Sequence, residues 1–297
     1  MLSYFLRRLA VAASVALTVS VVSFVLLHLS GDLASAMAGA EATAEQVAQI
    51  RQAHGLDRPL VEQYLSWLGR AARLDFGTSF FVQESVAGLI AHRLPVTFSL
   101  GLVSMGLALA VAIPMGVMAA VYRDSWLVDR AALAVAVLGQ ATPSFVSSLV
   151  LIVVFAVTLQ WLPVAGHADW TYFVLPALAL SFHAVPSLLR LTRSGVIDAL
   201  KADYIRTARA KGLPARAVVF KHALRNALVP VVALATVEMG FMLGGSVVVE
   251  SIFSLQGVGQ LAWESIARND FPVVQAVVLV VAPVSYTHLT LPTICSV

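Results

Sequence analysis

Few side chains in this sequence have the type and spacing that catalysis or metal binding would need. It contains no His-Glu-x-x-His zinc motif, no Gly-x-Ser-x-Gly nucleophile elbow and no Gly-Lys-Ser or Gly-Lys-Thr phosphate loop. We therefore expect no catalytic centre, no metal site and no cofactor in this chain. The histidines are scattered without ligand spacing, at His28, His54, His92, His167, His183, His222 and His288.

Glu238 is the one acidic residue that the sequence places well inside a long apolar run, with Gly240, Gly244 and Gly245 close behind it. A carboxyl group at such a position is costly unless it faces water, a partner or protein. Glu238 is therefore a candidate for lining a polar path through a membrane. The alternative is a structural hydrogen bond to a neighbouring helix, and the residues do not separate the two. His183 is more typical of a packed or interface histidine than of a ligand.

Composition indicates a protein that lies mostly within a membrane. Of its 297 residues, 59% are hydrophobic and 12% are charged, and the mean hydropathy is +0.87. An ordinary soluble domain has about 25% charged residues, so we expect an all-α, polytopic membrane protein. The single cysteine, Cys295, can form no disulfide within the chain.

Six apolar runs are candidates for helices that cross the membrane, which takes about 20 residues each. The first contains a basic front like that of a signal peptide, but its length favours an uncleaved helix. The runs are apolar all round and do not alternate, which favours helices over the strands of a barrel. They extend from about Leu9 to Leu29, Val96 to Val121, Ala131 to Leu159, Tyr172 to Leu189 and Leu228 to Val249, with a sixth that begins near Phe271.

Lysine and arginine residues predict the orientation, because cytoplasmic loops collect them. Arg7 and Arg8 place the amino terminus in the cytoplasm, and alternation then makes residues 190–227 cytoplasmic and residues 30–95 and 160–171 external. The external loop 160–171 has no lysine or arginine. The loop 190–227 has only two acidic residues against nine basic ones: Arg190, Arg193, Lys201, Arg206, Arg209, Lys211, Arg216, Lys221 and Arg225.

The cytoplasmic loop is predicted to contain two short helices joined by an elbow. The first runs from Gly195 to Lys211, and Gly212 can adopt the left-handed conformation that ends a helix. Pro214 then suits the first turn of the next helix. A fixed elbow favours docking of another protein, whereas charge alone would equally explain adhesion to anionic lipid. Apolar residues recur on the first helix at Ile197, Leu200, Tyr204, Ile205 and Ala208.

The external segment 30–95 is predicted to form two amphipathic helices. Thr43 and Gln46 have the spacing of a capping box, and the helix that they begin is expected to end near Gly55. A second helix restarts at Pro59 with apolar residues on one face. The pair could receive a substrate-binding protein, lie on lipid or pack on the spans of the chain itself.

The segment "YIRTARAKG", followed by "HALRNALVP", resembles the cytoplasmic signature loop of ABC importer permeases, written as Glu-Ala-Ala, three residues, Gly, nine residues, Ile, one residue, Leu-Pro. Gly212, Ala208 and Leu224 match it. Departures at three further signature positions are similar to those of the subfamily that imports dipeptides, oligopeptides and nickel. The signature Glu, first Ala and Pro are replaced by Arg206, Thr207 and Arg225.

Other segments extend the resemblance over about residues 1 to 282. They are "HGLDRPLVEQYLSWLGRAARLDFGTSF", "RLPVTFSLGLVSMGLALAVAIPMGVMAA", "PSFV" and "LGGSVVVESIFSLQGVGQLAWESIARNDFPVVQ". The resemblance implies the fold of a type I ABC importer permease and a place in the bacterial cytoplasmic (inner) membrane. It also implies a second permease subunit, two cytoplasmic ATPase subunits that bind ATP and Mg²⁺, and an extracytoplasmic substrate-binding protein, with no role for nucleic acid.

In this family the elbow couples ATP hydrolysis to movement of the spans, and the implied cargo is a di- or oligopeptide. Nickel or another small solute is the alternative cargo, and an ion-coupled secondary transporter is the rival class of protein. The residues that the resemblance assigns to the contact with the ATPase are Arg206, Thr207, Ala208, Arg209, Ala210, Lys211, Gly212, Leu213 and Pro214.

The end of the sequence departs from the family pattern. After "PVVQAVVLVVA" it continues as "PVSYTHLTLPTICSV", and residues 271–282 alone would be too short to span a bilayer. We expect residues 284–297 to be non-native, with a natural variant in which "YTHLTLPTI" completes the span as the alternative. The expected organisation is a first span with external helices at 1–95, a core permease domain at 96–283 and this tail.

Overall fold

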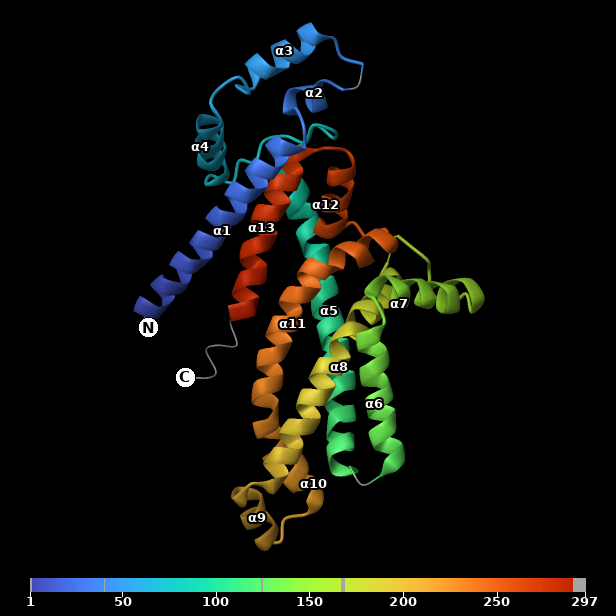
Figure 1. Ribbon diagram of the computed structural model, residues 1–297. Coiled ribbons are helices and arrows are strands. Elements are labelled where there is room, and N and C mark those ends of the chain that lie inside the picture. The colour runs from blue at the N-terminus through green and yellow to red at the C-terminus, as the bar shows by residue number, and fades with distance from the viewer. Residues whose placement is uncertain (1, 40, 124, 167–168, 291–297) are drawn as a thin grey trace. The chain divides into compact units, whose positions relative to one another are not determined.

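The computed structural model describes residues 2–39, 41–123, 125–166 and 169–290, and helices dominate this part of the chain (Figure 1). The one β-type pairing among the described residues is an isolated bridge between Thr78 and Ser85. The all-α prediction is therefore confirmed. The helices of the first half are α1 (Leu2–Ser30), α2 (Leu33–Ala38), α3 (Ala44–Ala53), α4 (Leu60–Ala71), α5 (Val86–Val121), α6 (Trp126–Ala141) and α7 (Ser144–Leu151).

A π-helical segment, η1 (Ile152–Thr158), continues directly from α7. A second π-helical segment connects the elbow to the long helix after it. The helices of the second half are α8 (Thr171–Lys201), α9 (Asp203–Ala210), α10 (Ala215–Ala217), η2 (Val218–Ala223), α11 (Leu224–Ile252), α12 (Val258–Ala267) and α13 (Phe271–Thr290).

Within the described residues, four helices are long and apolar enough to cross a membrane, and a fifth span is counted if the bent pair α6 and α7–η1 is one crossing. They correspond to the expected runs, and the sixth expected run lies in α13. Its segment Phe271–Ala282 is apolar but shorter than the others. Helix α13 itself continues to Thr290. Residues 291–297, the end of the expected non-native tail, lie outside the described part, so the origin of that tail stays a prediction.

Two expected helices have different bounds in the structure. The expected single run from Ala131 to Leu159 is bent by 108° between α6 and α7. Thr142 there has extended backbone (φ −93°, ψ 117°), because a residue that precedes a proline is disfavoured in the helical conformation. The expected fourth span continues as one helix to Lys201, and the chain then breaks at Ala202 (φ −71°, ψ 152°). The amphipathic helix expected from Gly195 to Lys211 is therefore two helices, the end of α8 and α9.

The chain divides into two compact units, of which the first contains the residues up to Val96 together with Gln256–Thr287. Its core joins the start of α5 to α12 and α13 through Val86, Ile90, Leu261 and Val273. In the same unit, α4 packs on α1, where Phe24 and Trp67 are buried. The face of α4 that packs on α1 therefore includes Trp67 and Ala71, whereas Leu60 and Leu65 are exposed.

The second unit contains Thr97–Leu255. Its largest core joins α5, α6, α8 and α11 through residues such as Met105, Ala132, Leu188 and Val231. Helix α8 packs against α6, α7 and α11. This arrangement fixes the long helix α8, whose end leads into the elbow, and places polar residues of α8 beside α11.

Candidate functional site

The elbow at Gly212 has the geometry that the sequence predicts. Gly212 has φ of +75°, a conformation that a residue with a Cβ adopts only at a cost. The N–H of Leu213 donates to the carbonyl of Ala208 at 3.3 Å, and the N–H of Gly212 donates to that of Arg209 at 2.9 Å. These two bonds form a Schellman motif, which satisfies carbonyls at the end of α9 and turns the chain toward Pro214.

A small apolar core holds the two arms of the elbow together. Ile205 and Ala208 of α9 pack with Val218 and Ala223 of η2, and the exposed fraction of each side chain is below 7%. Ala199 and Leu200 at the end of α8 pack against the same core. Movement of α9 would therefore be transmitted to α8 and, through η2, to α11, because packed side chains do not deform freely.

The outer surface of the elbow is open to a partner. Of the nine residues that the resemblance assigns to the ATPase contact, Ala208 is buried in the elbow core and the other eight are exposed. The exposed apolar side chains of Tyr204, Leu213 and Phe220 add hydrophobic surface beside the charges. An ion pair between Arg206 and Asp203 at 3.2 Å is fully accessible to solvent and contributes little to stability.

Glu238 lies on α11, half buried, and faces α8. Ser187 and His183, both on α8, are the polar side chains near its carboxyl group. The sequence analysis selected Glu238 and His183 separately, and the structure places them on two helices that pack together, α11 and α8. Within the described residues, no three His, Cys, Asp or Glu side chains are grouped so that they could hold a metal ion.

An open groove of 640 Å³ lies between α8 and α11 in the second unit, and Glu238 is not among the residues that line it. Ser187, which faces Glu238, also lines this groove. Arg190 donates from Nη1 to Oε1 of Gln140 on α6 at 2.7 Å, so its guanidinium group is held at the groove. The remaining lining residues are Leu191, Arg193, Ser194 and Leu234. Two arginines and two serines are thus part of the lining, although most of the surface of the groove is apolar.

Two buried acidic residues were missed by the sequence analysis. Glu250 is fully buried in α11 and accepts a hydrogen bond from the hydroxyl of Thr97 on α5 at 2.8 Å. The expected fifth span ended at Val249, which placed Glu250 in a loop. In the first unit, Asp270 accepts bonds from the Ser79 hydroxyl and from the N–H of Phe80. Asp270 lies in the short connection between α12 and α13, and nothing in the local sequence pattern indicated that it is buried.

These features define a class of protein: a polytopic α-helical membrane protein with an open groove among its spans and an exposed helical elbow at the end of them. Comparison with known proteins identifies the family. Residues 112–291 match the binding-protein-dependent transport system inner membrane component, and residues 1–101 match the N-terminal domain of such components. The chain belongs to this family, and it is a transport subunit rather than an enzyme.

Individual relatives agree with this assignment. The chain is 41% identical over 280 residues to the glutathione transport system permease protein GsiC of Escherichia coli K12, covering 94% of this chain and 91% of that protein. The GsiC protein of Salmonella typhi matches to the same extent. Permeases for peptides and related solutes are thus the group that this chain resembles.

Solved structures confirm the fold. An amino acid ABC transporter crystallised with histidines aligns with a TM-score of 0.53 and 16% identity, covering 70% of this chain and 92% of the other. The inward-facing MetNI methionine ABC transporter aligns with a TM-score of 0.53 and 19% identity, covering 70% and 96%. The chain therefore has the fold of an ABC importer permease and is a multi-pass protein of the inner membrane.

Proposed function

We propose that this chain is a permease subunit through which an ATP-driven importer moves short peptides or peptide-like solutes. The observation that supports this cargo is the 41% identity, over 94% of the chain, to a glutathione permease, since glutathione is itself a modified tripeptide. The two arginines that line the groove suit a solute that has a carboxylate, and the apolar remainder of its surface suits the apolar parts of a peptide. Nickel or another small solute is the second candidate cargo.

The elbow at Gly212 is the proposed contact with the ATPase subunit. Eight exposed residues from Arg206 to Pro214 would form the docking surface, and Ala208 would act from within by holding the elbow together. The ATPase subunits, not this chain, would bind ATP and Mg²⁺. The packing of Ile205 and Ala208 against η2 supports a transfer of movement from the docked subunit to α8 and α11.

Glu238 is proposed to line the translocation path. Its side chain is half buried, with Ser187 and His183 of α8 near its carboxyl group, and Ser187 also lines the open groove. A path residue needs both access to water and a partner that offsets its desolvation, and this position offers both. The structural alternative is a hydrogen bond that only joins α8 to α11.

The proposed assembly contains this chain, a second and different permease, two ATPase subunits and an extracytoplasmic binding protein. The amino terminus and the elbow would face the cytoplasm, since residues 190–227 are strongly basic. Residues 1–95 would supply the first span and external helices, residues 96–283 the core permease domain, and residues 284–297 a non-native tail.

Reconstitution of the purified transporter in liposomes tests this proposal. We expect ATP-dependent uptake of short peptides in the presence of the binding protein encoded beside this chain. Calorimetry on that binding protein should detect peptides and not Ni²⁺. Metal binding without peptide binding would contradict the proposed cargo, and uptake driven by an ion gradient without any ATPase subunit would contradict the proposed class of transporter.

A further inference from the structure

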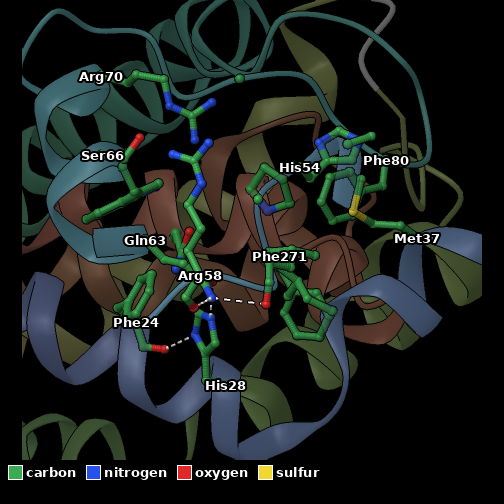
Figure 2. A pocket seen from close by; sticks show the side chains of 18 of the residues that line it. Phe24, His28, Met37, His54, Arg58, Gln63, Ser66, Arg70, Phe80 and Phe271 are labelled. Atoms are coloured by element: carbon green, nitrogen blue, oxygen red, sulfur yellow. Dashed lines mark hydrogen bonds between the residues drawn. The ribbon is translucent and has the colours of Figure 1, made fainter. Parts of the chain in front are cut away.

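A pocket in the first unit has no role in the proposed transport path. It has a volume of 460 Å³ and is lined by residues of the helices α1 to α4, the turn between α3 and α4, the segment after α4, and the start of α13 (Figure 2). Aromatic side chains and two arginines share its wall. The six residues that matter for its chemistry are Phe24, His28, Arg58, Gln63, Trp67 and Arg70.

One side of the pocket is a rigid aromatic junction between α1 and α4. The ring centroid of Phe24 lies 5.4 Å from that of Tyr64, 6.4 Å from that of Trp67 and 4.1 Å from that of His28. The hydroxyl groups of Ser20 and Tyr64 are 2.8 Å apart. Buried aromatic contacts of this kind hold two helices in a fixed relation, so the pocket exists without a ligand.

A chain of hydrogen bonds fixes the polar side of the pocket. Gln63 donates from Nε2 to the carbonyls of Arg58 at 2.8 Å and Leu56 at 3.2 Å, which leaves its Oε1 as an acceptor for Nε2 of His28 at 3.2 Å. The Nδ1 atom of His28 faces the carbonyl of Phe24 at 2.8 Å. Both ring nitrogens of His28 are therefore within hydrogen-bonding distance of polar atoms, which fixes the orientation of the ring at the pocket wall.

Arg58 and Arg70 place two guanidinium groups at this pocket without a counter-ion among the described residues. Figure 2 shows both side chains directed toward the same part of it. Arg51, which does not line the pocket, pairs instead with Asp32 at 2.6 Å. A hydrogen bond from Ser35 and the contact with Arg51 hold the pKa of Asp32 below its usual range. Glu62 is the one acidic residue among those that line the pocket, so the site has an excess of positive charge.

The pocket lies where a lipid headgroup is available. It begins at the end of α1, whose span Ala10–Leu29 is strongly hydrophobic on average. On α4, three large apolar side chains are exposed: Leu60 by 58%, Val61 by 68% and Leu65 by 58%. An amphipathic helix of this type lies in the membrane interface with its apolar side chains among the lipid chains. The arginines beside it are then at the level of the phosphates.

We propose that this pocket binds the phosphate group of an anionic phospholipid. Guanidinium groups form paired, charge-assisted hydrogen bonds with phosphate oxygens, and two of them against the single carboxylate of Glu62 favour an anionic lipid over a zwitterionic one. The aromatic side of the pocket contacts the apolar part of the same lipid. The bound lipid ties α4 and the turn at Arg58 to α1, and this role is independent of the cargo.

Native mass spectrometry of the transporter, purified through a tag on this chain and stripped of lipid, tests the proposal. Dioleoylphosphatidylglycerol is added at a fixed concentration, and inorganic phosphate and glutathione are added in separate samples. The Arg58→Gln, Arg70→Gln double variant should retain about tenfold less of this lipid, because it loses charge-assisted bonds at two positions. The matched variant Arg73→Gln, an exposed arginine outside the pocket, should retain as much as the wild type.

A second double variant distinguishes a loss of lipid binding from a loss of folding. Arg58→Lys with Arg70→Lys keeps the charge and should retain more lipid than the glutamine variant, at an unchanged unfolding temperature. Equal retention by the glutamine variant and the wild type would overturn the proposal. Displacement of the lipid by inorganic phosphate or glutathione, lost in the glutamine variant, would overturn it as well, because the pocket would then be a site for soluble anions.

Discussion

Gly139 of α6 lies directly against Pro186 of α8. A Cβ atom added to Gly139 would lie 2.6 Å from Cγ of Pro186 and 2.7 Å from the carbonyl oxygen of Phe182. Neither neighbour is the end of a flexible side chain, so one of the two helices would have to shift. The absence of a side chain at residue 139 is therefore what allows α6 and α8 to pack closely, as small residues do in membrane bundles.

Gly139→Ala should destabilise the permease for this reason. Overpacking typically costs about 1–3 kcal/mol, which exceeds the roughly 1 kcal/mol that alanine gains over glycine within a helix. Gly106→Ala on α5 is the matched control, since a Cβ there meets no atom within 4 Å. Thermal unfolding of the detergent-purified protein should show a lower midpoint for Gly139→Ala and an unchanged or higher one for Gly106→Ala. Equal midpoints would show that α6 can move away from α8 at no cost.

The sequence predicted well the structural features that depend only on residues close together in the chain. The capping box at Thr43 and Gln46 is present, and Gly212 has the expected positive φ. Both depend on side chains or backbone freedom within a few residues. The bend at Thr142 had a signal of the same kind in Pro143, but the apolar run around it was continuous and was interpreted as one span.

Features set by distant contacts were not predictable from local pattern. The break at Ala202 falls at a residue that favours helix, and the packing of Ile205 and Ala208 against η2 stabilises the new direction of the chain. The bond between Ser79 and Asp270 joins residues 191 positions apart. Hydropathy assigns both to a loop, and only the folded unit shows that they are buried.

Asp270 should be essential for the order of the segment after α4. It is 3% exposed, and it accepts from Phe80 N at 3.1 Å and from the Ser79 hydroxyl, which itself accepts from Val82 N at 3.0 Å. Asp270→Ala removes the acceptor of the Ser79 hydroxyl and of the Phe80 N–H, at a cost of about 1–3 kcal/mol. Hydrogen exchange should therefore become faster for the amides of residues 79–82.

Asp57→Ala is the control for Asp270→Ala, because Asp57 is exposed and no hydrogen bond of its carboxylate is seen among the described residues. Its exchange pattern at residues 79–82 should match that of the wild type. Unchanged exchange in Asp270→Ala would mean that the segment is held by its apolar contacts alone.

Gly212→Val should uncouple ATP hydrolysis from transport while the protein still inserts and folds. Valine at φ of +75° is strained by roughly 1–2 kcal/mol, which would distort the Schellman motif that ends α9. Substrate-stimulated ATPase activity of the reconstituted transporter should fall. A side chain at this position meets no atom within 4 Å, so the effect would come from the backbone and not from a clash.

Gly212→Asn tests whether the elbow needs the left-handed backbone conformation or glycine itself. Asparagine tolerates the left-handed conformation far better than valine, and Gly212→Asn should keep most of the stimulated activity. Normal stimulation in Gly212→Val would remove the elbow from the coupling mechanism. Equal loss in both variants would point instead to a close approach of the partner at this glycine.

Glu238→Gln should change which peptides are transported if the carboxylate lines the path. Loss of its negative charge would lower the rate for cationic peptides relative to anionic ones, because like charges repel and unlike charges attract within a low-dielectric path. Uptake of a cationic and an anionic dipeptide by the reconstituted transporter measures the ratio of the two transport rates.

Glu84→Gln, a control at an exposed acidic residue outside the spans, should leave that ratio unchanged. Ser187→Ala removes a polar neighbour of Glu238 on α8 but keeps the charge of Glu238, so it should affect both peptides alike. An unchanged ratio in Glu238→Gln, with a lower unfolding temperature, would assign Glu238 to the packing of α11 on α8 instead.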